Sequence, residues 1–186
     1  MKHRDPAIAI AYFSGNGHTK RLAEAVAAGM PSARLIDVEE IGKDDWAAMD
    51  AADAILFGTP TYMGSSAARF DRFLEEASDR WPDQLWADKI AGGFTVATYP
   101  SGDKLNTLMR LAVYAAQMGM IWVGPNQIGA PVAPQHPDLN RDGSHLGLMA
   151  TSSRDKREMI GAGDMETARR FGARIAAAAA RWREAR

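Results

Sequence analysis

The stretch AIAIAYFSGNGHT, residues 7–19, decides the fold of this chain. Its first seven residues, Ala7–Phe13, are all apolar or aromatic, which is typical of a strand buried on both faces of a parallel sheet. The other six form a glycine-rich loop, and His18–Ala28 then has helical spacing until Gly29 and Pro31 end it. A buried strand that turns directly into a helix predicts the first unit of an α/β fold.

The alternation of strand and helix continues along all 186 residues. Further strands are expected at 33–38, 54–58, 90–97 and 120–123, and further helices at 44–49, 66–77, 105–118 and from Asp164, the expected N-cap. The pattern predicts one domain over residues 1–186, a three-layer α/β fold with a doubly wound five-stranded parallel sheet of order 2-1-3-4-5. Residues 124–160 are rich in Gly, Pro, Asn, Asp and Ser, and we expect a long loop that is functional or ordered by a partner.

Composition narrows the class of protein. The chain has 22 basic and 23 acidic side chains, so it lacks the field that attracts nucleic acid. It has no cysteine, which excludes disulfides, thiolate catalysis and cysteine-ligated metals. The amino terminus lacks a signal-peptide pattern, and no apolar stretch approaches the roughly 20 residues that span a bilayer. We therefore expect a cytoplasmic protein without membrane insertion.

The first loop suits a phosphate group. It combines polar donors with glycines: Ser14, Gly15, Asn16, Gly17, His18 and Thr19. At the amino end of a helix the first N–H groups have no helical partner, and the dipole presents partial positive charge. The dinucleotide fingerprint would need Gly where Lys20 stands, and the Walker A spacing is absent. A glycine-rich turn without a ligand remains the alternative.

Two later loops follow the third and fourth strands and should lie at the same sheet edge, because ligands of this fold bind at the carboxyl ends of the strands. We expect these loops to bind a flat ring carried by the same ligand as the phosphate. The candidate residues are Pro60, Thr61, Tyr62, Met63 and Gly64 in one loop and Ala97, Thr98, Tyr99, Pro100 and Gly102 in the other. Aromatic and apolar side chains can form a wall for a flat ring, and backbone amides can stabilise negative charge on it. An ordinary loop whose Tyr62 covers the sheet is the alternative, and Asp103 is expected to cap the following helix.

These motifs resemble the flavodoxin family. SGNGHT is similar to the family's phosphate loop, T/S-x-T-G-x-T, with Asn16 in place of the usual Thr. GTPTYMG, SGDKLNTL…AAQMGMIWVG and DLNRDGSHLG…GDMETARRFGARIA resemble the WrbA-type NAD(P)H:quinone oxidoreductases. The resemblance implies noncovalently bound FMN, NAD(P)H as co-substrate, hydride delivery to a quinone, and a homodimer or homotetramer. It implies chemistry at flavin N5 rather than at a catalytic side chain.

Three positions depart from the WrbA-type pattern. The segment Glu39–Ala52 is short where those proteins have an insertion. Whether this chain forms the same tetramer as they do is therefore an open question. Tyr62 stands where they have Arg, and Met118 stands where relatives commonly have His. Contacts to nicotinamide or quinone are therefore expected to differ.

Two other functions stay open: a flavodoxin-type electron carrier, and a flavin-free interaction module on the same fold. Carriers usually bear a strongly acidic surface, and a net charge of −1 favours the enzyme. His136 and His145 lack the helical spacing of a metal site, so no metal is expected. Arg141 and the charged cluster 154–158 are interpreted as solvent-exposed.

Overall fold

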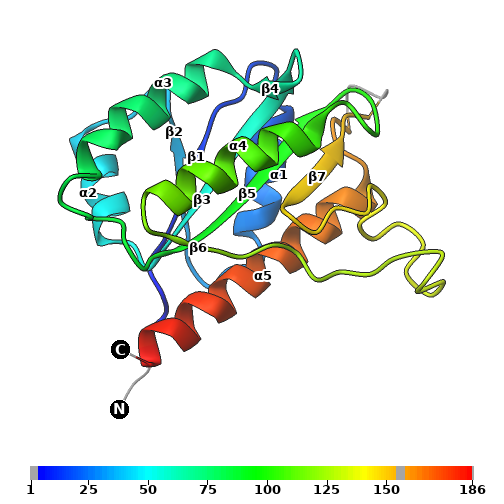
Figure 1. The fold of residues 1–186 in the computed structure, drawn as a ribbon. Helices are drawn as coiled ribbons and strands as arrows, with labels where there is room; N and C mark the ends of the chain where they lie inside the picture. The colour runs from blue at the N-terminus through cyan, green and yellow to red at the C-terminus, as the bar shows by residue number, and fades with distance from the viewer. Residues whose placement is uncertain (1–3, 154–157, 186) are drawn as a thin grey trace.

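The computed structural model describes residues 4–153 and 158–185, so most of the charged cluster 154–158 lies outside the described residues. A sheet lies between helices on both of its faces (Figure 1). The elements in chain order are β1 (Ile8–Tyr12), α1 (His18–Ala27), β2 (Arg34–Asp37), α2 (Lys43–Ala51), β3 (Ala54–Tyr62), β4 (Ser65–Ser66), α3 (Ala68–Ala77), the 3-10 turn η1 (Ser78–Arg80), β5 (Ile90–Ala97), α4 (Lys104–Gln117), β6 (Ile121–Trp122), β7 (Leu148–Thr151) and α5 (Ala162–Glu184).

The main strands run in the order β2-β1-β3-β5-β6, and each pairs in parallel with its neighbour. This confirms the predicted order, because β5 and β6 are the fourth and fifth predicted strands. Two short strands were not predicted and bring the sheet to seven: β4 pairs antiparallel with β3, and β7 pairs in parallel with β5.

The fifth strand is split in two. β6 pairs with the beginning of β5, at Ile90 and Ala91, and β7 pairs with its end, from Phe94 to Ala97. Between them, residues 123–147 leave the sheet and return, as the long excursion in Figure 1 shows. The expectation of a loop through residues 124–160 is therefore wrong at β7. We call residues 123–147 the excursion.

Two other local predictions need correction. Strand β3 extends to Tyr62 rather than ending at Gly58, because Thr59 and Pro60 still pair with β5. The last helix has Gly161 as its N-cap, and the carboxylate of Asp164 instead accepts the backbone N–H of Thr151 at 3.0 Å. Asp103 occupies the N-cap position of α4, as predicted, but makes no side-chain capping hydrogen bond.

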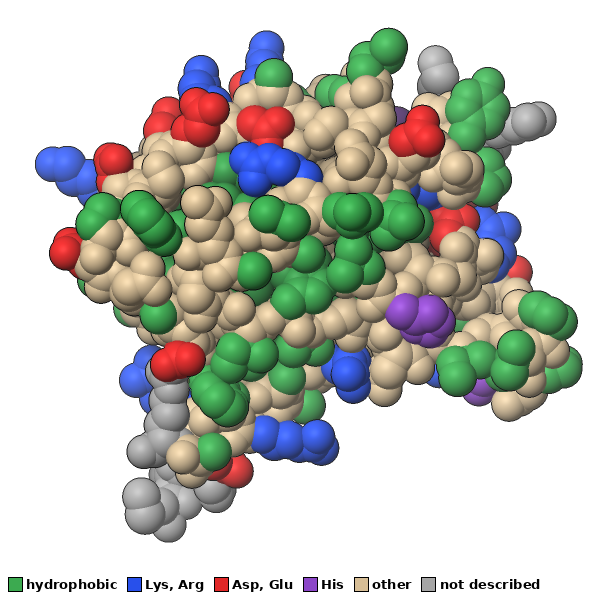
Figure 2. Space-filling view, in the orientation of Figure 1, with side chains coloured by type: hydrophobic (Ala, Val, Ile, Leu, Met, Phe, Trp, Pro, Cys, Tyr) green, Lys and Arg blue, Asp and Glu red, His purple; other side chains and the backbone are tan. Residues whose placement is uncertain are grey.

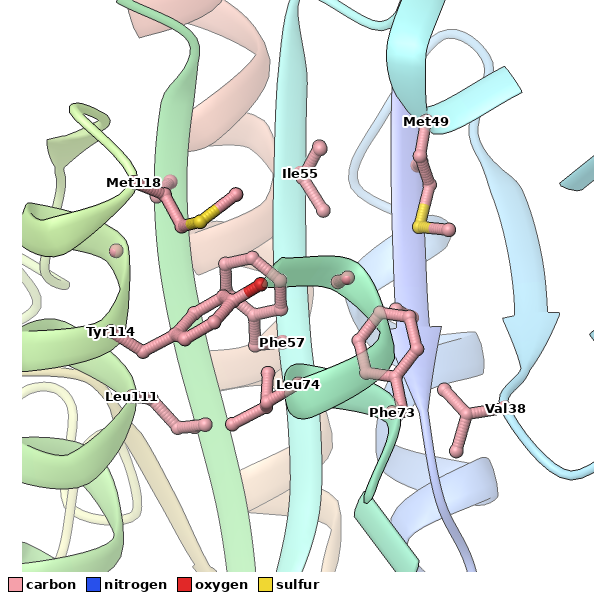
Figure 3. Close-up of a cluster of buried hydrophobic side chains, with 14 of the residues drawn as sticks. Val38, Met49, Ile55, Phe57, Phe73, Leu74, Leu111, Tyr114 and Met118 are labelled. Atoms are coloured by element: carbon pink, nitrogen blue, oxygen red, sulfur yellow. The ribbon is translucent and has the colours of Figure 1, made fainter. Parts of the chain in front are cut away.

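Two apolar clusters cover the two faces of the sheet. One packs under α2, α3 and α4 and includes Phe57, Phe73 and Tyr114 (Figure 3). The other packs under α1 and α5, which approach so closely that a Cβ on Gly172 would lie 2.0 Å from the carbonyl oxygen of Val26. None of the described helices is long and apolar enough to cross a bilayer. With both faces covered, the sheet can offer a binding site only at its edges.

Candidate functional site

A pocket of about 140 Å³ lies at the carboxyl edge of the sheet. It brings together the three predicted loops and the end of β7. Its lining residues are Ser14, Gly15, Asn16, His18, Thr19, Pro60, Thr61, Tyr62, Val96, Ala97, Thr98 and Ser152. Ten of these were predicted from the sequence, and they come from segments up to 84 positions apart, from Ser14 to Thr98.

The first loop turns sharply into α1. Gly17 is the N-cap and has φ 88°, a left-handed conformation that favours glycine. The hydroxyl oxygen of Ser14 accepts the N–H of Lys20 at 3.1 Å, and its own O–H remains available to donate. His18 and Thr19 belong to the first turn, where backbone N–H groups have no helical acceptor. The loop therefore presents donors and a helix dipole to an anion.

The second loop is a β-hairpin rather than an irregular loop. Met63 and Gly64 form its tip with φ 48° and 84°, and the side-chain amide of Asn106 donates to the carbonyl of Gly64 at 2.7 Å. Tyr62 reaches across to the first loop, since a Cβ on Gly15 would lie 2.5 Å from its hydroxyl oxygen. Gly15 thus allows an aromatic ring to close against the phosphate-type loop.

Thr61 supports the hairpin from inside. Its hydroxyl oxygen lies 2.8 Å from that of Thr95 and 2.8 Å from that of Thr107. These hydroxyl contacts join β3 to β5 and α4. The hydroxyl of Thr61 is therefore engaged within the protein, although the residue still lines the pocket.

Six predicted site residues do not line the pocket: Gly17, Met63, Gly64, Tyr99, Pro100 and Gly102. Gly17 and Gly102 shape turns, and Pro100 borders a neighbouring groove. Tyr99 is 72% exposed, Tyr62 is 45% exposed, and Met63 is fully exposed. Large apolar side chains exposed around one pocket favour a flat apolar ligand at its rim.

Sequence reasoning missed two lining residues. Val96 lies inside the predicted strand and reaches the pocket from β5. Ser152 follows β7, and its N–H donates to the carbonyl of Ala97 at 2.9 Å. Ser152 could be found only once the split of the fifth strand was known.

The site offers hydrogen-bond donors and apolar surface. The N–H groups at the start of α1 suit a phosphate, and the exposed side chains of Tyr62, Met63 and Tyr99 suit the face of a flat ring. The lining contains no acidic side chain and one imidazole, that of His18. Within residues 4–153 and 158–185 no group of three His, Cys, Asp or Glu could hold a metal ion. A bound cofactor, rather than an acid–base pair, is the chemistry that this lining suits.

Fold and pocket together define a doubly wound α/β protein with a pocket at its topological switch point. The flavodoxin domain model matches residues 9–116. Flavodoxin FldP of Pseudomonas aeruginosa is 38% identical over 172 residues, 90% of this chain and 93% of that protein. An NAD(P)H dehydrogenase (quinone) of Geotalea uraniireducens is 28% identical over 94% of this chain and 98% of its own length.

Among solved structures, the flavodoxin, WrbA-like protein from Agrobacterium tumefaciens is 44% identical, with a TM-score of 0.75 over 94% of this chain and 97% of that one. The chain belongs to the flavodoxin family. The predicted resemblance to its WrbA-type members is also confirmed.

Proposed function

We propose that this protein binds FMN and passes reducing equivalents from NAD(P)H to a quinone or a similar small acceptor. The observation that carries the proposal is the convergence of three loops on one pocket, with the amino end of α1 aimed into it. FMN, when bound, would take up and release the electrons. The protein would bind the cofactor, orient it and leave one ring face open.

The lining residues have distinct roles in this proposal. The first loop, from Ser14 to Thr19, would hold the phosphate through backbone N–H groups and hydroxyls. Tyr62 would flank the ring, with Met63 and Tyr99 at its rim. The backbone of Ala97 and Thr98 would face the polar edge of the ring, where N–H groups stabilise negative charge.

A one-electron carrier is the second candidate. It is supported by the similarity to a protein named flavodoxin over 90% of this chain. The net charge of −1 favours the enzyme, because carriers usually use a strongly acidic surface to attract partners.

Two measurements separate these functions. Purified protein loaded with FMN and then desalted is expected to keep the visible flavin bands, whereas a colourless protein would overturn both functions. The yellow protein is then mixed with NADH or NADPH, with and without benzoquinone. Benzoquinone-dependent oxidation of either nucleotide supports the enzyme. A flavin that neither nucleotide reduces, but that dithionite does reduce, supports the carrier.

We also propose that two copies associate through α4. Exposed apolar side chains gather over this helix (Figure 2), and Leu105, Met109 and Val113 form a stripe at intervals of four residues. A two-fold axis at Met109 would place Leu105 of one copy against Val113 of the other. Light scattering is expected to give a dimer or tetramer for the wild type and a smaller species for Met109→Lys. A monomeric wild type would contradict this.

A further inference from the structure

Lys104, the first residue of α4, has a completely buried side chain. Its ammonium donates to the carboxylate of Asp142, to the carbonyl of Ala150 at 3.2 Å and to the hydroxyl of Thr151 at 2.9 Å. An ammonium has three N–H groups, so the three acceptors satisfy it fully. The carboxylate of Asp142 is also largely buried and accepts the Thr151 hydroxyl at 3.3 Å.

The partners of Lys104 belong to segments that surround the pocket. Asp142 lies in the excursion, and Ala150 and Thr151 form the end of β7. The next residue, Ser152, lines the pocket and is bonded through its N–H to the carbonyl of Ala97. One buried cation therefore joins α4 and the excursion to the strand end behind the pocket.

Lys104 also closes the third loop. Its backbone N–H donates to the carbonyl of Ser101 at 3.1 Å. Gly102 and Asp103 have φ 51° and 53°, and Asp103 is a residue type that pays a cost in this left-handed conformation. A Cβ on Gly102 would lie 2.7 Å from the Cβ of Ala97, so the loop folds back tightly on the strand end. A shift of Lys104 would move the backbone that faces the pocket.

We propose that Lys104, held by Asp142, is a positioning residue for FMN: it fixes Ala97, Thr98 and Ser152 in the binding geometry before the cofactor arrives. The inference rests on the proposed function. A buried ion pair rarely adds net stability over apolar side chains of similar size, which favours a role in geometry. A pocket that is formed in only a tenth of the molecules would bind about tenfold more weakly.

The test compares Lys104→Met with Lys89→Met. Lys89 is the matched control, because it is half-buried at the other end of β5 and donates to the carbonyls of Asp50 and Ala52. FMN affinity is measured by quenching of flavin fluorescence, and folding by thermal denaturation of the FMN-free proteins. Lys104→Met is expected to bind FMN about tenfold more weakly. The FMN affinity of Lys89→Met is expected to stay within about twofold of that of the wild type, even if its thermal midpoint falls as far as that of Lys104→Met.

A double variant covers the case in which Lys104→Met does not fold. Lys104→Met with Asp142→Leu leaves no unpaired buried charge and is expected to fold, yet to keep the weakened FMN binding. Wild-type affinity in either folded variant would overturn the inference and leave the proposed function intact. Equal weakening by Lys89→Met would also overturn it. Failure of the wild type to bind FMN would overturn the proposed function, and this inference with it.

Discussion

The two edges of the sheet use similar polar groups in different ways. At the amino edge, the Asp50 carboxylate accepts from Arg80 at 2.8 Å and from the indole N–H of Trp86 at 2.7 Å, and Lys89 donates to carbonyls of Asp50 and Ala52. At the carboxyl edge, serine, asparagine and threonine residues instead line a pocket. The comparison teaches that polar groups of the amino edge bind one another, whereas several of those at the carboxyl edge line a pocket that we propose holds a ligand. Substitutions at the two edges should therefore separate stability from binding.

The largest effect is expected from Ser14→Asp. A carboxylate at this position would repel the phosphate of FMN and remove a donor, so affinity should fall more than about 100-fold. The same carboxylate lies at the start of α1, where it should stabilise the FMN-free fold by about 0.5–1 kcal/mol. Fluorescence titration and thermal denaturation measure the two effects.

Gly42→Asp is the matched control, because it places the same charge at the N-cap of α2, away from the pocket. Its FMN affinity should stay within about twofold of the wild type. Retained FMN binding by Ser14→Asp would contradict the role given to the first loop.

Asp50→Ala should lower stability and leave FMN affinity unchanged, which is the opposite of the result expected for Ser14→Asp. It leaves the fully buried indole N–H of Trp86 without its acceptor, which should cost about 2–3 kcal/mol and lower the thermal midpoint by about 5–10 °C. FMN affinity of the folded protein should be unchanged. The exposed Asp79 offers a control in Asp79→Ala, which should change neither quantity. Weakened FMN binding by Asp50→Ala would show that the two edges are not independent.

Tyr62→Ala should weaken FMN binding about tenfold, because an aromatic contact with the ring contributes about 1–1.5 kcal/mol. Tyr62→Phe keeps the ring face and should bind nearly as the wild type does. An equal loss in both variants would assign the effect to the hydroxyl near Gly15 instead. Titration of both variants with FMN decides between these interpretations.

The smallest effect concerns Asp164, whose carboxylate accepts the N–H of Thr151, the residue before Ser152 of the pocket lining. The pKa of its carboxyl is raised, because burial outweighs the lowering effects of the Thr151 N–H and the Arg141 guanidinium. The folded state therefore holds this proton more tightly than the unfolded state does. The stability contributed by the protonated Asp164 carboxyl is fully present below the pKa that this group has in the unfolded state. It is lost as the pH rises through the pKa that the group has in the folded state.

Asp164→Asn removes this titration. The midpoint of the variant minus that of the wild type should therefore be larger at pH 7 than at pH 4, because only the wild type loses stability as the carboxyl ionises. Thermal denaturation at the two pH values measures it. A midpoint difference that does not change with pH would contradict the assignment.

The parts of this fold that depend on local signals could be predicted from the sequence. The apolar run of β1, the glycine-rich loop and the spacing of α1 lie next to one another, so strand, turn and helix could be predicted together. The alternation of elements then gave the strand order. For the same reason the first loop could be placed between β1 and α1, whereas its role in binding phosphate stays a prediction.

Features that depend on distant partners could not be predicted. β7 has four residues, and its pairing partners lie more than 50 positions earlier in β5, so Ser152 was missed. The hairpin formed by β3 and β4 contains polar Thr61, whose burial depends on Thr95 and Thr107. A lysine at the start of a helix is expected to be exposed, and the burial of Lys104 depends on Asp142, Ala150 and Thr151, which lie far along the chain.

The central claim is that the amino end of α1 binds the phosphate of a flavin. Parallel fluorescence titrations with FMN and with riboflavin, which shares the ring but lacks the phosphate, test it most directly. FMN should bind at least about 100-fold more tightly than riboflavin, because charge-assisted hydrogen bonds to the phosphate would be lost. Riboflavin binding as tight as that of FMN, or no binding of FMN, would contradict the claim.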